Sequence, residues 1–195
     1  MRQNRAVTGS ITRSLSVSAA AIALAFSALA CSGDRPASTS ASCPKPKGLT
    51  SVGETIPKDC VLERLEGGTL RIGDLVGKPA VINFWAAWCT FCIDEMPDFQ
   101  KVFAATGAKV SFVGADLLNV DGETRAVART FAAKTKVRYP LVYDAGGLLY
   151  GHFSAQLIMP VTIFVNDKGA VAFRQFGPLT ESRIREILRT KLKVT

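Results

Sequence analysis

The feature that most constrains this chain is an apolar run followed, after a short gap, by two closely spaced cysteines. Residues 80–85 are apolar on both faces, which suits a central strand that is covered on each side. Helical periodicity starts just after Cys89 and continues to about Ala105. Its apolar positions are Ile93, Met96, Phe99, Val102 and Phe103. The sequence therefore predicts a buried strand, a turn, and a helix whose first turn carries Cys89 and Cys92.

The C-x-x-C unit of Cys89 and Cys92 has three common uses in proteins: haem attachment, half of a zinc site, or a redox pair. Haem attachment requires a histidine directly after the second cysteine, where Ile93 stands. A structural zinc site needs a second ligand pair. The only other residues that could supply one lie far away in the sequence, at Cys43, Cys60 and His152. We therefore expect no metal and no cofactor, and the redox pair remains.

The position of each cysteine predicts its role. Cys89 stands where the strand has ended and the helix begins, and a helix N-terminus favours thiolate over thiol. Since the thiolate is the nucleophile in disulfide exchange, we expect Cys89 to attack. Cys92 lies one turn into the helix and is placed to resolve the mixed disulfide.

The rest of the chain alternates between strand and helix patterns. Expected strands lie at residues 61–66, 69–72, 109–115, 139–143, 161–165 and 170–176, and expected helices at 123–134 and 180–192. The first two strands flank a Gly-Gly turn and form a hairpin. This order predicts an α/β fold in which a central mixed β-sheet is flanked by helices, with an N-terminal β-hairpin.

The N-terminus has the pattern of an export signal. Arg2, Arg5 and Arg13 precede an apolar run at residues 17–30, which is too short to span a bilayer comfortably. These arginines supply three of the eight net positive charges, and the other basic residues are spread along the chain, so no nucleic acid is expected as a partner. We expect a signal peptide over residues 1–30, a flexible linker over 31–50 and one domain over 51–195.

The way in which the signal is cleaved stays open. Ala28-Leu29-Ala30 fits an ordinary leader. The same residues with Ser27 and Cys31 resemble a bacterial lipobox, although Ala28 replaces its usual leucine. We favour lipidation of Cys31, which would anchor the protein on the outer face of the bacterial cytoplasmic membrane. Secretion as a free protein is the alternative.

The remaining cysteines are an even number if Cys31 carries lipid. Cys43 and Cys60 then form a natural structural disulfide in a compartment that permits disulfides. Closing a loop of this size stabilises a fold by about 3 kcal/mol in the chain-entropy model.

The stretch from Asn83 to Pro97, Asn-Phe-Trp-Ala-Ala-Trp-Cys-Thr-Phe-Cys-Ile-Asp-Glu-Met-Pro, resembles the active-site segment of thioredoxin-like proteins. It is most similar to the membrane-tethered TlpA/ResA type within the AhpC/TSA–thioredoxin-like superfamily. The resemblance covers about residues 51–192, including the lead-in at residues 75–79 and Pro160. It implies a thioredoxin-like fold and an extracytoplasmic enzyme that exchanges disulfides with protein clients. It also implies a membrane electron donor or acceptor.

The resemblance also assigns roles to residues around the dithiol. Met159 and Pro160 match the loop whose proline is cis and contacts substrate, and Trp88 is expected to cover the dithiol and contact substrate. Asn83 stands where thioredoxin has a buried Asp that accepts a proton from the second cysteine. Glu95, on the Cys92 face of the helix, matches a Glu that tunes the dithiol in ResA-like proteins. A solvated Glu early in a helix is the alternative.

Other activities on the same fold remain to be weighed. The resemblance favours a reductase, including one for cytochrome c maturation or disulfide homeostasis, over an oxidant that forms disulfides in exported proteins. A thioredoxin-fold metallochaperone would use a C-x-x-x-C spacing with a distant His, and the spacing here is shorter. A peroxiredoxin-type peroxidase would have Thr where Ala86 stands.

Overall fold

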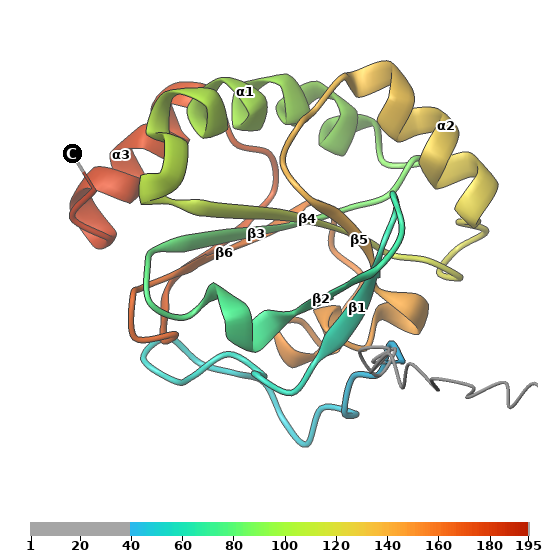
Figure 1. Cartoon of the computed structure of the whole chain (residues 1–195), viewed down its shortest axis with the longest axis horizontal. Helices are drawn as coiled ribbons and strands as arrows, with labels where there is room; N and C mark the ends of the chain where they lie inside the picture. The colour runs from blue at the N-terminus through green and yellow to red at the C-terminus, as the bar shows by residue number, and fades with distance from the viewer. Residues whose placement is uncertain (1–39, 195) are drawn as a thin grey trace, which may run out of the picture. The chain divides into compact units, whose positions relative to one another are not determined.

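A seven-stranded mixed sheet forms the centre of the computed structural model, which describes residues 40–194 (Figure 1). The strand order is β2-β1-β5-β4-β3-β6-β7. The pairs β3–β4 and β4–β5 are parallel, and the other four pairs are antiparallel. The strands are β1 Val61–Arg64, β2 Thr69–Arg71, β3 Ala80–Trp85, β4 Ser111–Asp116, β5 Leu141–Tyr143, β6 Val161–Val165 and β7 Val171–Phe176.

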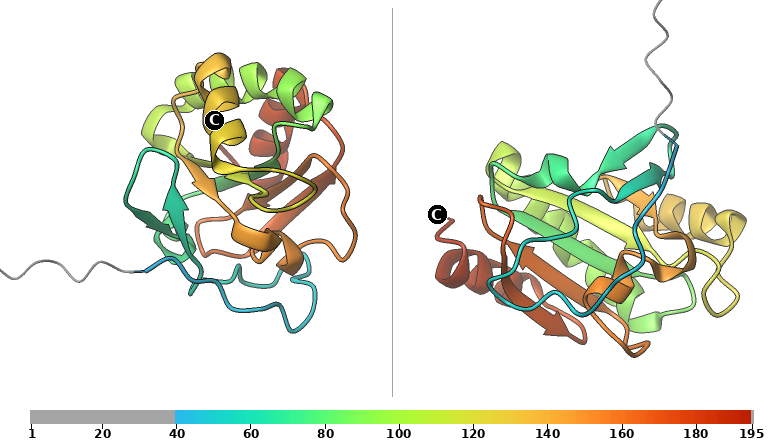
Figure 2. Two further views of the ribbon diagram at one scale, coloured as in Figure 1. Left: turned by 90° about the vertical axis from the view of Figure 1, so that its right-hand side faces the viewer. Right: turned by 90° about the horizontal axis from the view of Figure 1, so that it is seen from below.

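Three helices lie together over one face of this sheet (Figure 1). They are α1 Thr90–Thr106, α2 Arg125–Thr135 and α3 Glu181–Lys191. The other face is covered by the segment that leads into β1 and by the 3-10 turns η1 Ile72–Leu75 and η4 Tyr150–His152 (Figure 2). Two further 3-10 turns are η2 Gly107–Lys109, which follows α1, and η3 Ala145–Gly147. An apolar core therefore lies on each side of the sheet.

The sequence patterns predicted the sheet, its flanking helices and the N-terminal hairpin, and all are present. All six residues of β3 are buried, as the run of apolar residues on both faces predicted. Helix α2 begins two residues later than predicted because Thr124, not Glu123, precedes it as N-cap and accepts the Val127 N–H. Thr180 caps α3 in the same way, through the Arg183 N–H.

The segment before β1 belongs to the domain over more of its length than predicted. Ser42 pairs with Val61 in a β-bridge, and the Thr50 N–H donates to the His152 carbonyl at 2.6 Å. These bonds hold part of the predicted linker, so the domain begins before residue 51. Within residues 40–194 no helix is both long and apolar enough to cross a bilayer.

Candidate active site

Cys89 and Cys92 lie at the junction between β3 and α1. The fully buried strand fixes the turn over residues 86–88, and Cys89 itself is the N-cap of α1. Its Sγ accepts the Cys92 N–H at 3.2 Å. The two sulfurs form a disulfide, with Cys89 6% exposed and Cys92 fully buried. The first cysteine is thus the one that solvent and a client can reach.

A shallow hollow opens over Cys89. It has a volume of about 310 Å³ and is lined by Trp88, Cys89, Thr90, Phe91, Leu157 and Met159. The Met159–Pro160 peptide bond is cis, as the resemblance implied, and Met159 shares this hollow with Cys89. The Trp88 indole N–H donates to the Val120 carbonyl at 3.3 Å, which orients its ring beside the dithiol. Pro160 itself is buried.

Glu95 is buried in the core beneath the dithiol, only 2% exposed. The Asn83 side-chain amide donates to one of its carboxyl oxygens at 2.7 Å, and the Leu179 N–H donates to the other at 2.9 Å. Burial raises the pKa of Glu95 to about 8, although both hydrogen bonds act in the opposite direction. Neighbouring Asp94 is exposed. A carboxyl group with a pKa of about 8 therefore lies one helical turn from Cys92.

A second buried acid holds the turn in front of the cysteines. Glu123 is 1% exposed, and its carboxylate accepts the Ala87 N–H at 2.8 Å. It also accepts the Trp88 N–H, while burial raises its pKa. The sequence pattern placed Glu123 inside a helix and gave it no role. The feature of the sequence that could have indicated its position outside the helix is Thr124, the N-cap residue that directly follows it.

Asp116 lies next to this turn, at the carboxyl end of β4 and in register with Trp85. It is fully buried, and within residues 40–194 neither of its carboxyl oxygens has a hydrogen-bond partner. Burial raises its pKa to about 8, and the nearby charges of Glu123 and Asp144 add to that rise. The sequence pattern did not single out Asp116, since an acid at a strand end usually faces solvent.

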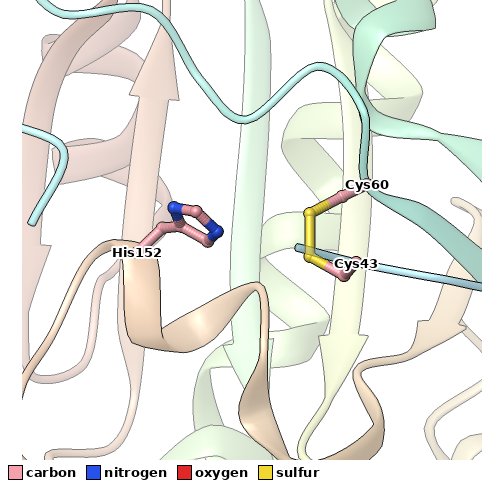
Figure 3. A group of neighbouring side chains, drawn as sticks. All are labelled: Cys43, Cys60 and His152. Carbon is pink, nitrogen blue, oxygen red and sulfur yellow. A yellow bond between two sulfur atoms is a disulfide. The ribbon is translucent and has the colours of Figure 1, made fainter. Parts of the chain in front are cut away.

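Cys43 and Cys60 are joined by a disulfide, and they belong to the apolar core on the other side of the sheet from Cys89 and Cys92. Their sulfurs and a ring nitrogen of His152 all lie within 4.8 Å of one another (Figure 3). These three residues were set aside only as ligands that could complete a zinc site with Cys89 and Cys92, and the two cysteines among them pack in the other apolar core, away from that pair. The sequence did not predict that these three residues lie beside one another. Cys31 lies outside the described residues.

This fold, with a C-x-x-C pair at a helix start and a cis-proline loop beside it, defines a thioredoxin-like thiol–disulfide oxidoreductase. Residues 52–174 match the AhpC/TSA family, and the chain belongs to that family. This is the superfamily that the resemblance of the active-site stretch indicated.

Named relatives agree with this class. The thiol-disulfide oxidoreductase ResA of Bacillus subtilis is 30% identical over 145 residues, which are 73% of this chain and 76% of ResA. The sporulation thiol-disulfide oxidoreductase A of the same organism is 26% identical over 132 residues, 67% of this chain and 78% of the relative. The crystal structure of StoA from B. subtilis is similar with a TM-score of 0.57 and 27% identity, over 65% of this chain and 92% of that one.

Proposed function

We propose that this protein is an extracytoplasmic thiol–disulfide reductase of protein clients, in which Cys89 attacks and Cys92 resolves. The observation that carries the proposal is the asymmetry of the pair. Cys89 caps α1, receives an N–H from its first turn and keeps 6% of its surface exposed, whereas Cys92 is fully buried. A helix N-terminus stabilises a thiolate, and only an accessible thiolate can reach a client disulfide.

In the proposed reaction the Cys89 thiolate attacks one sulfur of a client disulfide. A mixed disulfide forms, and the other client sulfur leaves as a thiolate. The Cys92 thiol then loses its proton and attacks the Cys89 sulfur, which releases the second client thiolate. The client has gained two electrons, and Cys89 and Cys92 have become a disulfide. A membrane electron donor must return two electrons before the next cycle.

Glu95 fits the step in which Cys92 loses its proton. Proton transfer is efficient when donor and acceptor have similar pKa values. A free thiol has a pKa of about 8.5, and Glu95 has one of about 8. Asn83 cannot accept this proton, but its amide holds the Glu95 carboxyl in place. Glu95 is the residue proposed to tune the dithiol.

Glu95 also supports the reducing direction. Strong oxidants of this fold owe their potential to a stabilised reduced form, whose thiolate has a low pKa. Since the pKa of Glu95 is about 8, it is at and above this pH that its carboxylate, one turn from Cys92, repels a thiolate and so destabilises the reduced form. The pair should therefore give up its electrons readily. A role in cytochrome c maturation or disulfide homeostasis is compatible with this direction.

An apolar rim around Cys89 is suited to contact with unfolded or extended clients. Several large apolar side chains there are exposed: Trp88 by 38%, Phe91 by 61%, Leu157 by 52% and Ile158 by 40%. Exposed apolar side chains that gather at one place mark interaction sites. We assign client binding to this rim together with Met159 and Pro160.

Export and anchoring complete the proposal. A charged, apolar leader over residues 1–30 supports export, and Cys31 directly after it supports lipidation. The Cys43–Cys60 disulfide is compatible with an oxidising compartment. A lipid mass on Cys31 of the membrane fraction is expected. An unmodified Cys31 in a free, secreted chain would favour the ordinary leader instead.

Trapping of intermediates tests the assignment of the two cysteines. Cys92→Ser should accumulate mixed disulfides between Cys89 and client proteins, because no resolving thiol remains. Cys89→Ser is the matched control and should accumulate none. Equal trapping by both variants would contradict the assignment.

The reduction potential of the Cys89–Cys92 pair tests whether the protein reduces or oxidises its clients. For a reductase we expect a value nearer about −270 mV than about −120 mV.

A further inference from the structure

We propose that Cys43, Cys60 and His152 form a redox-gated binding site for a thiophilic d10 cation, zinc(II) or copper(I). The site is closed in the disulfide form and open when both cysteines are reduced. It is separate from the Cys89/Cys92 active site and does not depend on the function proposed above.

The geometry of the three side chains is the first observation. The two sulfurs and one ring nitrogen of His152 all lie within 4.8 Å of one another. Ligands of one zinc ion, at bond lengths of about 2.0–2.3 Å, lie less than about 4.8 Å from one another, which is the range that separates the His152 nitrogen from the sulfurs. Figure 3 shows a ring nitrogen of His152 pointing toward the two sulfur atoms. Once reduction breaks the S–S bond, the two sulfurs only have to move apart around one cation, beside the imidazole that already faces them.

The donor set determines which cation would bind. Two thiolates and one imidazole are soft to borderline ligands, which select zinc and copper(I) over magnesium or calcium. Three protein ligands satisfy copper(I), or zinc with a fourth position left for a water or another oxygen. This proposal therefore concerns a thiophilic cation and not a hard one.

His152 is already held in place by the residue next to Cys43. Its Nε2 lies 3.0 Å from the Pro44 carbonyl oxygen. Because a carbonyl can only accept, Nε2 donates its proton in the disulfide form. Binding of a cation through Nε2 would move that proton to Nδ1, the other neutral tautomer. The freed Pro44 oxygen would then lie beside the site as a candidate fourth ligand.

A cation can reach the site from solvent. An open hollow of about 670 Å³ lies beside it, with Pro44 and His152 among its lining residues. Its charged side chains are two lysines and two acids, so their charges cancel and the hollow does not repel a cation. They are Lys45, Lys47, Glu54 and Asp59. Cys43 and His152 are partly exposed, and Cys60 is buried.

Opening the site requires two electrons, which a protein or small-molecule dithiol supplies. A thiolate attacks the partly exposed Cys43 sulfur, the S–S bond breaks, and Cys60 leaves as a thiolate. The second thiol of the reductant then releases Cys43 and becomes part of a new disulfide. Binding of the cation replaces the remaining thiol protons, so zinc uptake releases protons to solvent.

The test uses the full chain with Cys31→Ser, Cys89→Ser and Cys92→Ser, which leaves Cys43 and Cys60 as its only cysteines. After reduction by a phosphine, which does not add thiols, it is titrated with zinc against a coloured chelator, and with copper(I) in a parallel anaerobic series. We expect one equivalent of metal in the reduced form and none in the oxidised form. Cobalt(II) in place of zinc should give sulfur-to-metal charge-transfer absorption.

His152→Ala in the same background should weaken binding by at least about tenfold, as the loss of ligand contacts does at metal sites. Asp59→Asn is the matched control, because Asp59 lines the same hollow but is not one of the three donors, and it should bind like the parent. Circular dichroism of each reduced variant checks that the domain is folded. Binding that is unaffected by His152→Ala, or absent from the folded reduced protein, would overturn the proposal. Neither result would bear on Cys89 and Cys92, which are missing from the background.

Discussion

Glu95 differs from an ordinary acid in the first turns of a helix because it faces the core. Its carboxyl oxygens have an amide and a backbone N–H as partners, and no cation neutralises it within residues 40–194. Its raised pKa is therefore a result of burial that two neutral hydrogen bonds only partly offset. A group of this kind is coupled to any charge that forms nearby, above all to the thiolates of the reduced pair.

Replacing Glu95 with Gln should lower the apparent pKa values of the cysteines. The substitution keeps the shape of the side chain and removes a charge that repels the thiolate. We expect the thiolate titration of the reduced protein and its pH–rate profile for disulfide exchange to move to lower pH. Asp94→Asn, which changes an exposed acid on the next residue, should leave both curves in place. A Gln variant whose curves overlay those of the parent would remove Glu95 from the mechanism.

At the scale of elements, the turn between β3 and α1 depends on a residue from another part of the chain. The parallel pairing of β3 with β4 places Asp116 beside Trp85, and the loop after β4 brings Glu123 under the turn. The Glu123 carboxylate receives two backbone N–H groups, from Ala87 and Trp88. Glu123 is thus a positioning residue for Cys89.

Glu123→Gln should loosen this turn, because a neutral amide oxygen accepts the Ala87 N–H more weakly than the carboxylate oxygen does. A hydrogen bond to a charged group contributes about 1.5–3 kcal/mol and a neutral one about 0.5–1.5 kcal/mol, so we expect a decrease of about 1 kcal/mol in the free energy of unfolding. The exchange rate of Cys89 should fall as well. Glu66→Gln, at an exposed position in the β1–β2 turn, is the control. Denaturant unfolding and single-turnover exchange measure the two effects, and an unchanged exchange rate would remove the positioning role.

Local patterns predicted much of this architecture. The apolar run of β3 and the periodicity of α1 depend on neighbouring residues, so they can be read directly from the sequence. The burial of Glu123 and Asp116 depends on strand pairing between distant segments, which no local pattern records. The same holds for His152, which lies far from Cys43 and Cys60 in the chain but beside them in space. The fold and the cysteines were therefore predictable, and the surrounding acids were not, apart from Glu95.

For the molecule as a whole, four buried acids make stability depend on pH. Burial raises the pKa of Glu95 and Asp116 to about 8 and that of Asp144 to about 6, and it raises the pKa of Glu123 as well. Each of these pKa values lies above the ordinary value, which is 4.5 for Glu and 3.8 for Asp. The native state therefore binds more protons than the unfolded chain in this window. The stability that these protonated acids contribute is complete below about pH 4, and this contribution is lost as the pH rises toward 8.

Asp116→Asn should flatten this dependence. Its carboxyl group has no hydrogen-bond partner within the described domain, so the neutral amide removes the cost of a buried charge that grows as the pH rises. Since one pKa unit corresponds to about 1.4 kcal/mol, we expect the variant to gain a few kcal/mol relative to the parent between pH 4 and pH 8. Asp94→Asn should show no such gain. Denaturant unfolding across this pH range measures the difference. If the difference in stability between Asp116→Asn and the parent is the same at every pH, then Asp116 does not change its charge between pH 4 and pH 8 in the folded protein. That result would contradict the electrostatic account of this core.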